Sequence, residues 1–198
     1  VRSTLGVFVG ARQQRLQTIA RVENKYFGNG KLDSFTEFDC TQFVGMDTIS
    51  QPPVAVPSIT EAFAGGRIDL ISDAQLIQTL IVVQQSEDRL RTVIDYLGSQ
   101  STDLSKKYPQ LITLIRATDN RNEIFDEQVF VTEGYRLSAR CHFLDTTPEP
   151  EFLSDMVRGL QINQWYVTFL NRHLEKLDQL AAVLDGKVIV DSEKSKAK

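Results

Sequence analysis

A long repeat of apolar residues near the C-terminus constrains the fold more than any other feature of the sequence. From about Glu151 to Leu184, positions spaced alternately by three and four residues carry apolar side chains with one polar exception: Leu153, Met156, Leu160, Asn163, Val167, Leu170, Leu174, Leu177, Ala181 and Leu184. This spacing places an apolar stripe along a helix that packs against other helices at a shallow angle. Pro148 and Pro150 mark its start, and Gly186 is expected to end it.

Two further long helices follow from the same spacing. The first covers about Thr4 to Tyr26. The second starts at Ser72, where Ser72 to Gln75 form a capping-box pattern, and it is expected to end at Gly98. Three long helices with matching apolar stripes predict a mainly α fold, namely an antiparallel helical bundle of three long helices plus shorter helices.

Shorter elements connect the long helices. Ser58 to Ala64 is predicted to be a short helix stopped by two glycines, and Leu111 to Ile115 a fourth, shorter helix. Between Tyr135 and Phe143, apolar and polar residues alternate strictly, which is the period of a β-strand. Because a lone strand is unstable, residues 127–143 are interpreted as an extended segment, with a candidate partner strand in Glu127 to Val131.

Composition and charge predict a single domain over residues 1–190. Residues 191–198 are a short charged tail that is expected to be disordered. The formal net charge is −4, and no clustered basic face offers a site for nucleic acid. Nucleic acid is therefore not predicted as a partner.

The sequence contains none of the common catalytic or cofactor-binding motifs. It lacks CxxC, HExxH, a phosphate-binding glycine loop and GxSxG. His142 and His173 are far apart, and His173 lies beside the apolar stripe of the last helix, so we interpret it as a packed residue rather than a metal ligand. No catalytic residue, cofactor or metal ligand is assigned, and the chain is predicted not to be an enzyme.

Four polar residues interrupt the apolar stripes of the long helices: Arg12, Glu23, Glu87 and Asn163. A buried charge without a partner is strongly destabilising, so these residues need an explanation. In one interpretation they set the register of the helices or lie at the solvent-exposed edge of the bundle. In the other they are ligand-binding residues that line a polar pocket between helices, the usual place for a small-molecule site in a bundle.

The first helix begins with an uncapped apolar run, Leu5 to Ala11. This run is too short to cross a bilayer, which needs roughly 20 apolar residues. It fits either the end of a truncated membrane-spanning helix over residues 1–11 or a soluble helix with an apolar first turn. The membrane interpretation predicts that this end of the helix projects from the core, with Phe8 and Val9 exposed or covered only by a neighbouring molecule. Packing of these side chains inside the domain's own core would exclude it.

Several segments together resemble a known group of proteins. They are the junction at Leu5 to Gly10, the motif Phe38-Asp-Cys40, the segment Pro57 to Asp73, the pair Arg140-Cys141 and the helical segment Gln164 to Asn171. With them the chain resembles uncharacterised bacterial single-pass membrane proteins that carry a mostly helical extracytoplasmic domain. The resemblance implies anchoring through an N-terminal helix that this sequence does not include. It also implies a location at the bacterial inner membrane, with the domain in the periplasm or outside the cell. The family brings no function with it.

The resemblance further implies a disulfide between Cys40 and Cys141. Such a bond would place the domain in an oxidising compartment. The alternative is a cytosolic protein with two buried free thiols, and the apolar side of the alternating segment that carries Cys141 suits that alternative.

Two functions of different classes follow from these observations. The first is a non-enzymatic interaction or scaffold domain outside the cytoplasm, which binds a protein partner or a second copy of itself through its helical faces. The second is a sensory small-ligand-binding bundle resembling the input domains of bacterial chemoreceptors and sensor kinases. A sensor needs a second membrane span or an output module, and this sequence contains neither. The interaction domain is therefore the preferred prediction.

Overall fold

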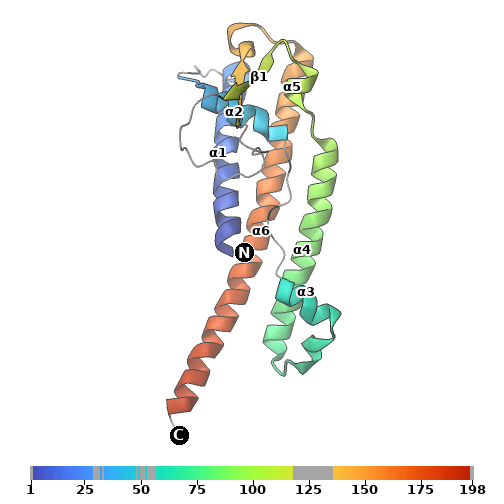
Figure 1. Ribbon diagram of the computed structural model, residues 1–198, viewed down its shortest axis with the longest axis vertical. Coiled ribbons are helices and arrows are strands. Elements are labelled where there is room, and N and C mark those ends of the chain that lie inside the picture. The colour runs from blue at the N-terminus through green and yellow to red at the C-terminus, as the bar shows by residue number, and fades with distance from the viewer. Residues whose placement is uncertain are drawn as a thin grey trace. The chain divides into compact units, whose positions relative to one another are not determined.

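The fold is mainly α, as the apolar periodicity predicts. The computed structural model describes residues 2–28, 32, 34–47, 49, 52, 57–117 and 136–196. Three long helices dominate it: α1 (Arg2–Phe27), α4 (Ala74–Gln100) and α6 (Pro150–Lys196) (Figure 1). All three begin within two residues of their predicted starts, while the antiparallel arrangement of all three stays a prediction.

The chain divides into two compact units, where the sequence predicted one domain. The first unit consists of Val1–Val9, Gln51–Val93 and Thr168–Lys198, and the second of Gly10–Ser50 and Ile94–Val167. Each of the three long helices contributes residues to both units. We describe the second unit first because it contains the disulfide.

Short elements cluster around a two-stranded sheet in the second unit. They are α2 (Glu37–Val44), the 3-10 turn η1 (Gly45–Asp47), α5 (Leu104–Lys107), β1 (Ile112–Ala117), β2 (Arg136–Cys141) and the 3-10 turn η4 (His142–Asp145). A capping box starts α2: the hydroxyl of Thr36 accepts from the backbone N–H of Asp39, and the Asp39 carboxylate accepts from the backbone N–H of Thr36. The helix is tied to the sheet by the Thr41 hydroxyl, which accepts from the backbone N–H of Ala139 on β2 at 3.1 Å.

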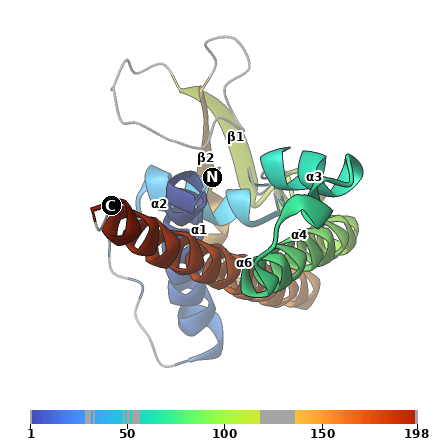
Figure 2. The same ribbon diagram turned by 90° about the horizontal axis from the view of Figure 1, so that it is seen from below.

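The two strands revise one prediction and confirm another. The segment Leu111 to Ile115, expected as a helix, is instead β1, because its β-branched residues pair with a strand that follows later in the chain. The alternating segment is a strand, β2, as predicted, and pairs antiparallel with β1 from Ile112↔Cys141 to Ala117↔Arg136 (Figure 2). The candidate partner at Glu127 to Val131 lies outside the described residues.

The core of the second unit is a continuous set of buried apolar side chains. It comprises Ile19, Val22, Cys40, Phe43, Met46, Leu104, Tyr108, Ile112, Ala139, Cys141, Phe143, Phe152, Met156 and Leu160. Phe143 joins its parts, since its ring centroid lies 5.0 Å from that of Phe43 and 5.1 Å from that of Phe152. A glycine allows η1 to approach α6 closely: a Cβ atom at Gly159 would come within 2.9 Å of the Met46 sulfur.

The predicted disulfide between Cys40 and Cys141 is present. It ties α2 to the end of β2, with 5.7 Å between the two Cα atoms and a sequence separation of 101. Both cysteines belong to the buried core of the second unit. The interpretation as two free thiols is therefore wrong.

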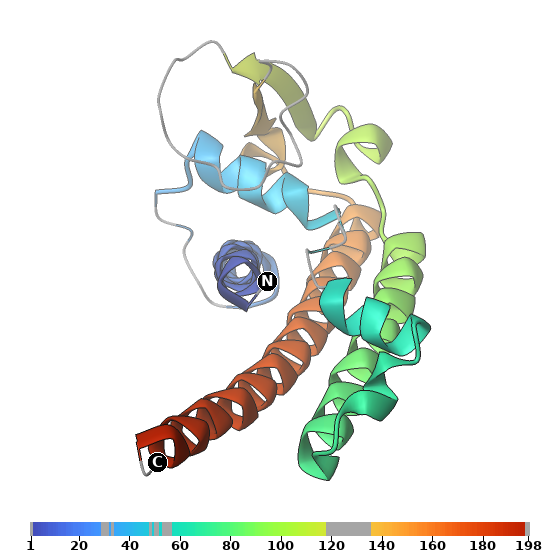
Figure 3. The same ribbon diagram turned by 60° about the horizontal axis from the view of Figure 1, so that its bottom comes forward.

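In the first unit, α4 and the second part of α6 run beside each other, and α3 (Pro57–Ala64) with the 3-10 turn η2 (Arg67–Leu70) folds back along the first part of α4 (Figure 3). The short helix α3 was predicted. The start of α4 differs from the expected capping box at Ser72, because the Asp73 carboxylate accepts from the backbone N–H of Leu76 at 2.9 Å.

Two glycines that were expected to end helices lie inside them. Helix α4 continues past Gly98 to Gln100, and α6 continues past Gly186 to Lys196. Neither glycine has the positive φ of a helix-ending glycine; among the described glycines only Gly66 does. A glycine within a helix costs only about 1 kcal/mol, which a long helix tolerates. The helix also covers part of the tail that was predicted to be disordered.

The apolar beginning of α1 is partly buried within the structure. Leu5 is 0% exposed and Val9 4% exposed, Phe8 is half-buried, and Val7 is 55% exposed. The predicted exposure of Val9 is therefore wrong, and Phe8 is only partly exposed. The packing of this end counts against the interpretation as a truncated membrane-spanning helix. Among the described residues, no helix combines the length and the hydropathy that crossing a membrane requires.

Candidate ligand-binding groove

Helices α4 and α6 pack against each other in antiparallel directions in the first unit. His173 Nδ1 on α6 lies 3.1 Å from Ser86 Oγ on α4. One turn along each helix, the guanidinium carbon of Arg89 lies 5.8 Å from the centroid of the Phe169 ring. Later residues of α4 thus meet earlier residues of α6, which fixes the antiparallel direction of this pair.

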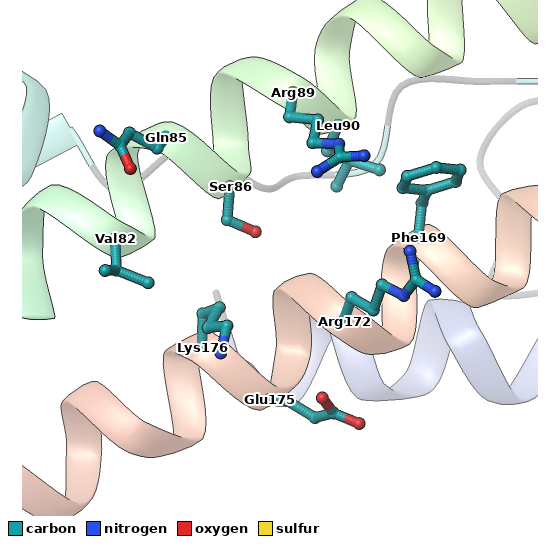
Figure 4. A pocket seen from close by; sticks show the side chains of 9 residues that line it. All are labelled: Val82, Gln85, Ser86, Arg89, Leu90, Phe169, Arg172, Glu175 and Lys176. Atoms are coloured by element: carbon teal, nitrogen blue, oxygen red, sulfur yellow. The ribbon is translucent and has the colours of Figure 1, made fainter.

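A groove of about 370 Å³ lies along this pair of helices. It is lined by Val82, Gln85, Ser86, Arg89 and Leu90 from α4 and by Phe169, Arg172, Glu175 and Lys176 from α6 (Figure 4). All nine residues belong to the first unit. The volume lies within the range of roughly 300–1,000 Å³ that is usual for small-molecule sites.

Positive charge dominates the lining of the groove. Arg89, Arg172 and Lys176 contribute three cations, and Glu175 contributes one carboxylate. Among the described residues, no carboxylate forms an ion pair with the guanidinium of Arg89 or of Arg172. The groove therefore has a surplus of positive charge that the described part of the protein does not neutralise.

The ring of Phe169 holds the two arginines together. Their guanidinium carbons lie 5.8 Å (Arg89) and 5.5 Å (Arg172) from the ring centroid, both within the range of cation–π attraction. Figure 4 shows the side chains of both arginines reaching toward this ring from the two helices. The ring lies beside each guanidinium and shields part of it from solvent. The N–H groups at the guanidinium edges can still donate to a ligand.

A hydroxyl and an apolar side chain complete the groove. Ser86 points into the space between the helices, and its hydroxyl is held by His173, which is fully buried (Figure 4). The prediction that His173 is a packed residue is confirmed. Val82, which is half-buried, supplies apolar surface, so the groove offers cationic, hydroxyl and apolar contacts within one small volume.

None of the four polar residues predicted from the apolar stripes lines this groove. Arg12 is fully buried in the second unit, where its guanidinium carbon lies 5.1 Å from the ring centroid of Tyr166. Glu23 is half-buried in the same unit. Their role in ligand binding stays a prediction.

The other two polar residues form hydrogen bonds inside the structure. Asn163, fully buried, donates to the carbonyl oxygens of Met46 at 2.7 Å and Gly159 at 2.9 Å. Glu87, in the first unit, accepts from Arg91 one helical turn away at 2.8 Å. The bond from Asn163 to Met46 joins α6 to η1 and fits the interpretation in which polar residues of the stripes fix the register of packed elements, whereas the Glu87–Arg91 pair lies within α4.

The groove was not predicted from the sequence because its charged residues flank the apolar stripes and do not interrupt them. Phe169 directly precedes the stripe residue Leu170 on α6. Arg89 precedes the stripe residue Leu90 on α4, and Arg172 lies between Leu170 and Leu174 on α6. The sequence signal that could have indicated the groove was the combination of cations beside two apolar stripes with an aromatic residue next to one of these stripes.

Comparisons with known proteins and the search for metal ligands add no further site. No family model matches the chain, and neither curated proteins nor solved structures give a significant match. Within the residues that the structure describes, no group of three or more His, Cys, Asp and Glu side chains is arranged to hold a metal ion.

Proposed function

We propose that this chain is a non-enzymatic domain that binds a small ligand in the α4–α6 groove. The observation that carries this proposal is the pairing of Arg89 and Arg172 on the ring of Phe169, inside a groove of suitable volume. Side chains held in place before a ligand arrives lose little freedom when it binds. The sequence favoured a protein-interaction domain over a ligand-binding one, and the presence of this groove is our reason for preferring ligand binding.

The proposed location is the periplasm or the exterior of a bacterial cell. The Cys40–Cys141 disulfide supports it, because such bonds persist mainly in oxidising compartments. Anchoring to the inner membrane through an N-terminal helix is supported by the family resemblance alone. The burial of Leu5 and Val9 counts against the anchor, because the end of a membrane-spanning helix was expected to project from the core.

Filling the groove tests the proposed function. We expect a screen of small molecules by NMR to find ligands that shift resonances of the first unit. Gln85→Trp places a bulky ring at an exposed lining position and should abolish these shifts. Ala182→Trp, at an exposed position of α6 outside the groove, is the matched control and should retain them. Ligands that bind Gln85→Trp as tightly as the wild type would contradict the assignment.

The second candidate, an interaction domain, is favoured by exposed aromatic side chains of the second unit. Phe27, Tyr96 and Trp165 expose 57%, 58% and 54% of their surface. Phe27 also borders an apolar groove of about 580 Å³ with Pro150, Leu153, Ser154, Val157, Arg158 and Gln161. Large exposed aromatic residues are the usual anchors of protein interfaces.

Self-association is the form of this second function that can be tested on the chain itself. Light scattering over a concentration series should reveal a dimer, and Trp165→Ser or Phe27→Ser should shift it toward the monomer. The substitution Leu184→Ser changes an exposed apolar residue of the first unit and should leave the dimer intact. A wild-type chain that stays monomeric at every concentration would remove self-association from consideration.

A further inference from the structure

We infer that the ligand of the α4–α6 groove is a compact dianion, such as a phosphate monoester or a short dicarboxylate. This inference rests on the proposed function of the groove as a ligand site. It names the charge and the size of the ligand. The reasoning starts from the charge of the lining, continues with the placement of the donors, and ends with the space available.

The lining charge matches two negative charges on the ligand. Arg89, Arg172 and Lys176 contribute three positive charges and Glu175 one negative charge, so the lining has a surplus of two. A neutral ligand leaves that surplus unbalanced, and a cation would be repelled by it. A dianion neutralises it and gains charge-assisted hydrogen bonds, which are roughly twice as strong as neutral ones.

The donors are placed so that both arginines can bind one ligand. Phe169 lies beside both guanidinium groups and limits their motion through cation–π attraction. A guanidinium binds a carboxylate or phosphate through two parallel N–H donors, so two of them suit two oxyanion groups or one phosphate with several oxygens. Ser86, whose side chain is shorter than those of the arginines, provides a neutral hydroxyl donor. It comes from α4, across the groove from Lys176 and Glu175 on α6 (Figure 4).

Space and local repulsion limit the ligand to a small molecule. The groove has a volume of about 370 Å³, and Val82 offers apolar surface for a short carbon skeleton. Glu175 repels additional negative charge at its end of the groove, which disfavours extended polyanions. Lys176 Nζ donates to Gln179 at 3.2 Å, and its flexible four-carbon stem allows it to turn toward a ligand.

Isothermal titration calorimetry at low ionic strength tests the inference with defined probes. Phenyl phosphate represents the phosphate monoesters, succinate the dicarboxylates, acetate the monoanions and glucose the neutral molecules. We expect one site for phenyl phosphate or succinate, and the tighter of the two identifies the chemical class. Acetate and glucose should bind at least tenfold more weakly. Affinity should fall with added salt, because the groove is open to solvent.

Single substitutions distinguish the groove from general positive charge. Arg89→Gln and Arg172→Gln should each weaken dianion binding about tenfold or more, the effect of losing one charge-assisted contact. Arg158→Gln removes an exposed cation of the same helix α6 in the second unit and should have no effect. Glu175→Gln should tighten binding, because it removes the repelling carboxylate. Thermal melting of each variant confirms that the fold is retained.

Three outcomes would overturn the inference. The first is that neither dianion binds at millimolar concentration. The second is that acetate binds as tightly as the dianions, and the third is that Arg158→Gln weakens binding as much as Arg172→Gln. If neither dianion binds but a neutral or cationic ligand binds the wild type and not Gln85→Trp, the inferred ligand class is wrong while the proposed function of the groove stands. The failure of the inference and the failure of the proposed function are thus distinguishable.

Discussion

The imidazole of His173 and the hydroxyl of Ser86 connect α6 to α4, with 3.1 Å between Nδ1 and Oγ. His173 is fully buried, whereas Ser86 lines the groove. The hydrogen bond therefore runs from the packed interior of the first unit to its candidate ligand site. When Nδ1 donates this bond, the hydroxyl proton of Ser86 is directed toward another acceptor, such as an anion in the groove.

Replacing Ser86 should affect ligand binding and stability together. We expect Ser86→Ala to weaken binding of the preferred dianion several-fold and to lower the free energy of unfolding by about 1 kcal/mol, the usual contribution of one hydrogen bond. Calorimetry and urea unfolding measure the two effects. Ser99→Ala removes an exposed hydroxyl of the same helix α4 and serves as the control. Unchanged affinity in Ser86→Ala would exclude the hydroxyl as a ligand donor.

Removing the disulfide should destabilise the chain strongly. The bond closes a loop with a sequence separation of 101. In the chain-entropy model, a loop of this length contributes roughly 4–5 kcal/mol to the free energy of unfolding. We expect the double variant Cys40→Ala/Cys141→Ala to lose a large part of this amount in urea unfolding. A reductant should destabilise the wild type and leave the double variant unchanged.

The same bond allows a test of the proposed compartment. We expect the chain to be fully oxidised when it is directed to the periplasm of a bacterial host and reduced when it is produced in the cytosol. Alkylation of free thiols followed by electrophoresis separates the two forms. Similar melting temperatures for the oxidised and reduced chains would show that the fold does not depend on export.

The long helices could be predicted from the sequence because their pattern is sustained. The stripe from Leu153 to Leu184 repeats over many turns, and only a helix places such residues on one face. The short run around Ile112 has no such length, and a short apolar run fits a helix and a strand equally well. Its pairing with a strand that starts at Arg136 decides the outcome, and this long-range contact leaves no local signal.

The groove could not be predicted for a related reason. Arg89 and Phe169 are 80 positions apart in the sequence, and they meet only because α4 and α6 pack in one particular register. The polar residues of the stripes were visible from periodicity, but Asn163 and Glu87 form hydrogen bonds within the protein. Two of the breaks in the stripes thus proved to be residues that bond within the protein, while the charged residues of the candidate site lie beside the stripes.

Asn163 is expected to be structural. Asn163→Leu removes the donor to the carbonyl oxygens of Met46 and Gly159 and should lower the free energy of unfolding by about 1–3 kcal/mol, because a buried acceptor loses its partner. Urea unfolding measures the loss, with Gln161→Leu at an exposed position of α6 as the control. Dianion binding should be retained. Lost binding with retained stability would instead support the predicted ligand role of Asn163.

The acid dependence of stability should depend in part on Asp155. Partial burial opposes its ionisation, but hydrogen bonds from Lys107 Nζ at 2.7 Å and Tyr108 Oη at 2.8 Å hold the pKa of Asp155 below its ordinary value of 3.8. A carboxyl group whose pKa is lowered by folding stabilises the protein above its unfolded pKa. That contribution is lost as the pH falls through the lower pKa of the folded state.

We therefore expect Asp155→Asn to be less stable than the wild type at pH 7 by about 1 kcal/mol, a value reduced by the solvent exposure of Lys107. The difference between the two proteins should shrink as the pH falls below about 4. Urea unfolding at a series of pH values measures it. Because Asp39 has a lowered pKa in both proteins, the comparison isolates Asp155. The control Asp69→Asn, at an exposed position of η2, should have the same free energy of unfolding as the wild type at every pH. A difference between Asp155→Asn and the wild type that does not change with pH would refute the role of the Asp155 charge.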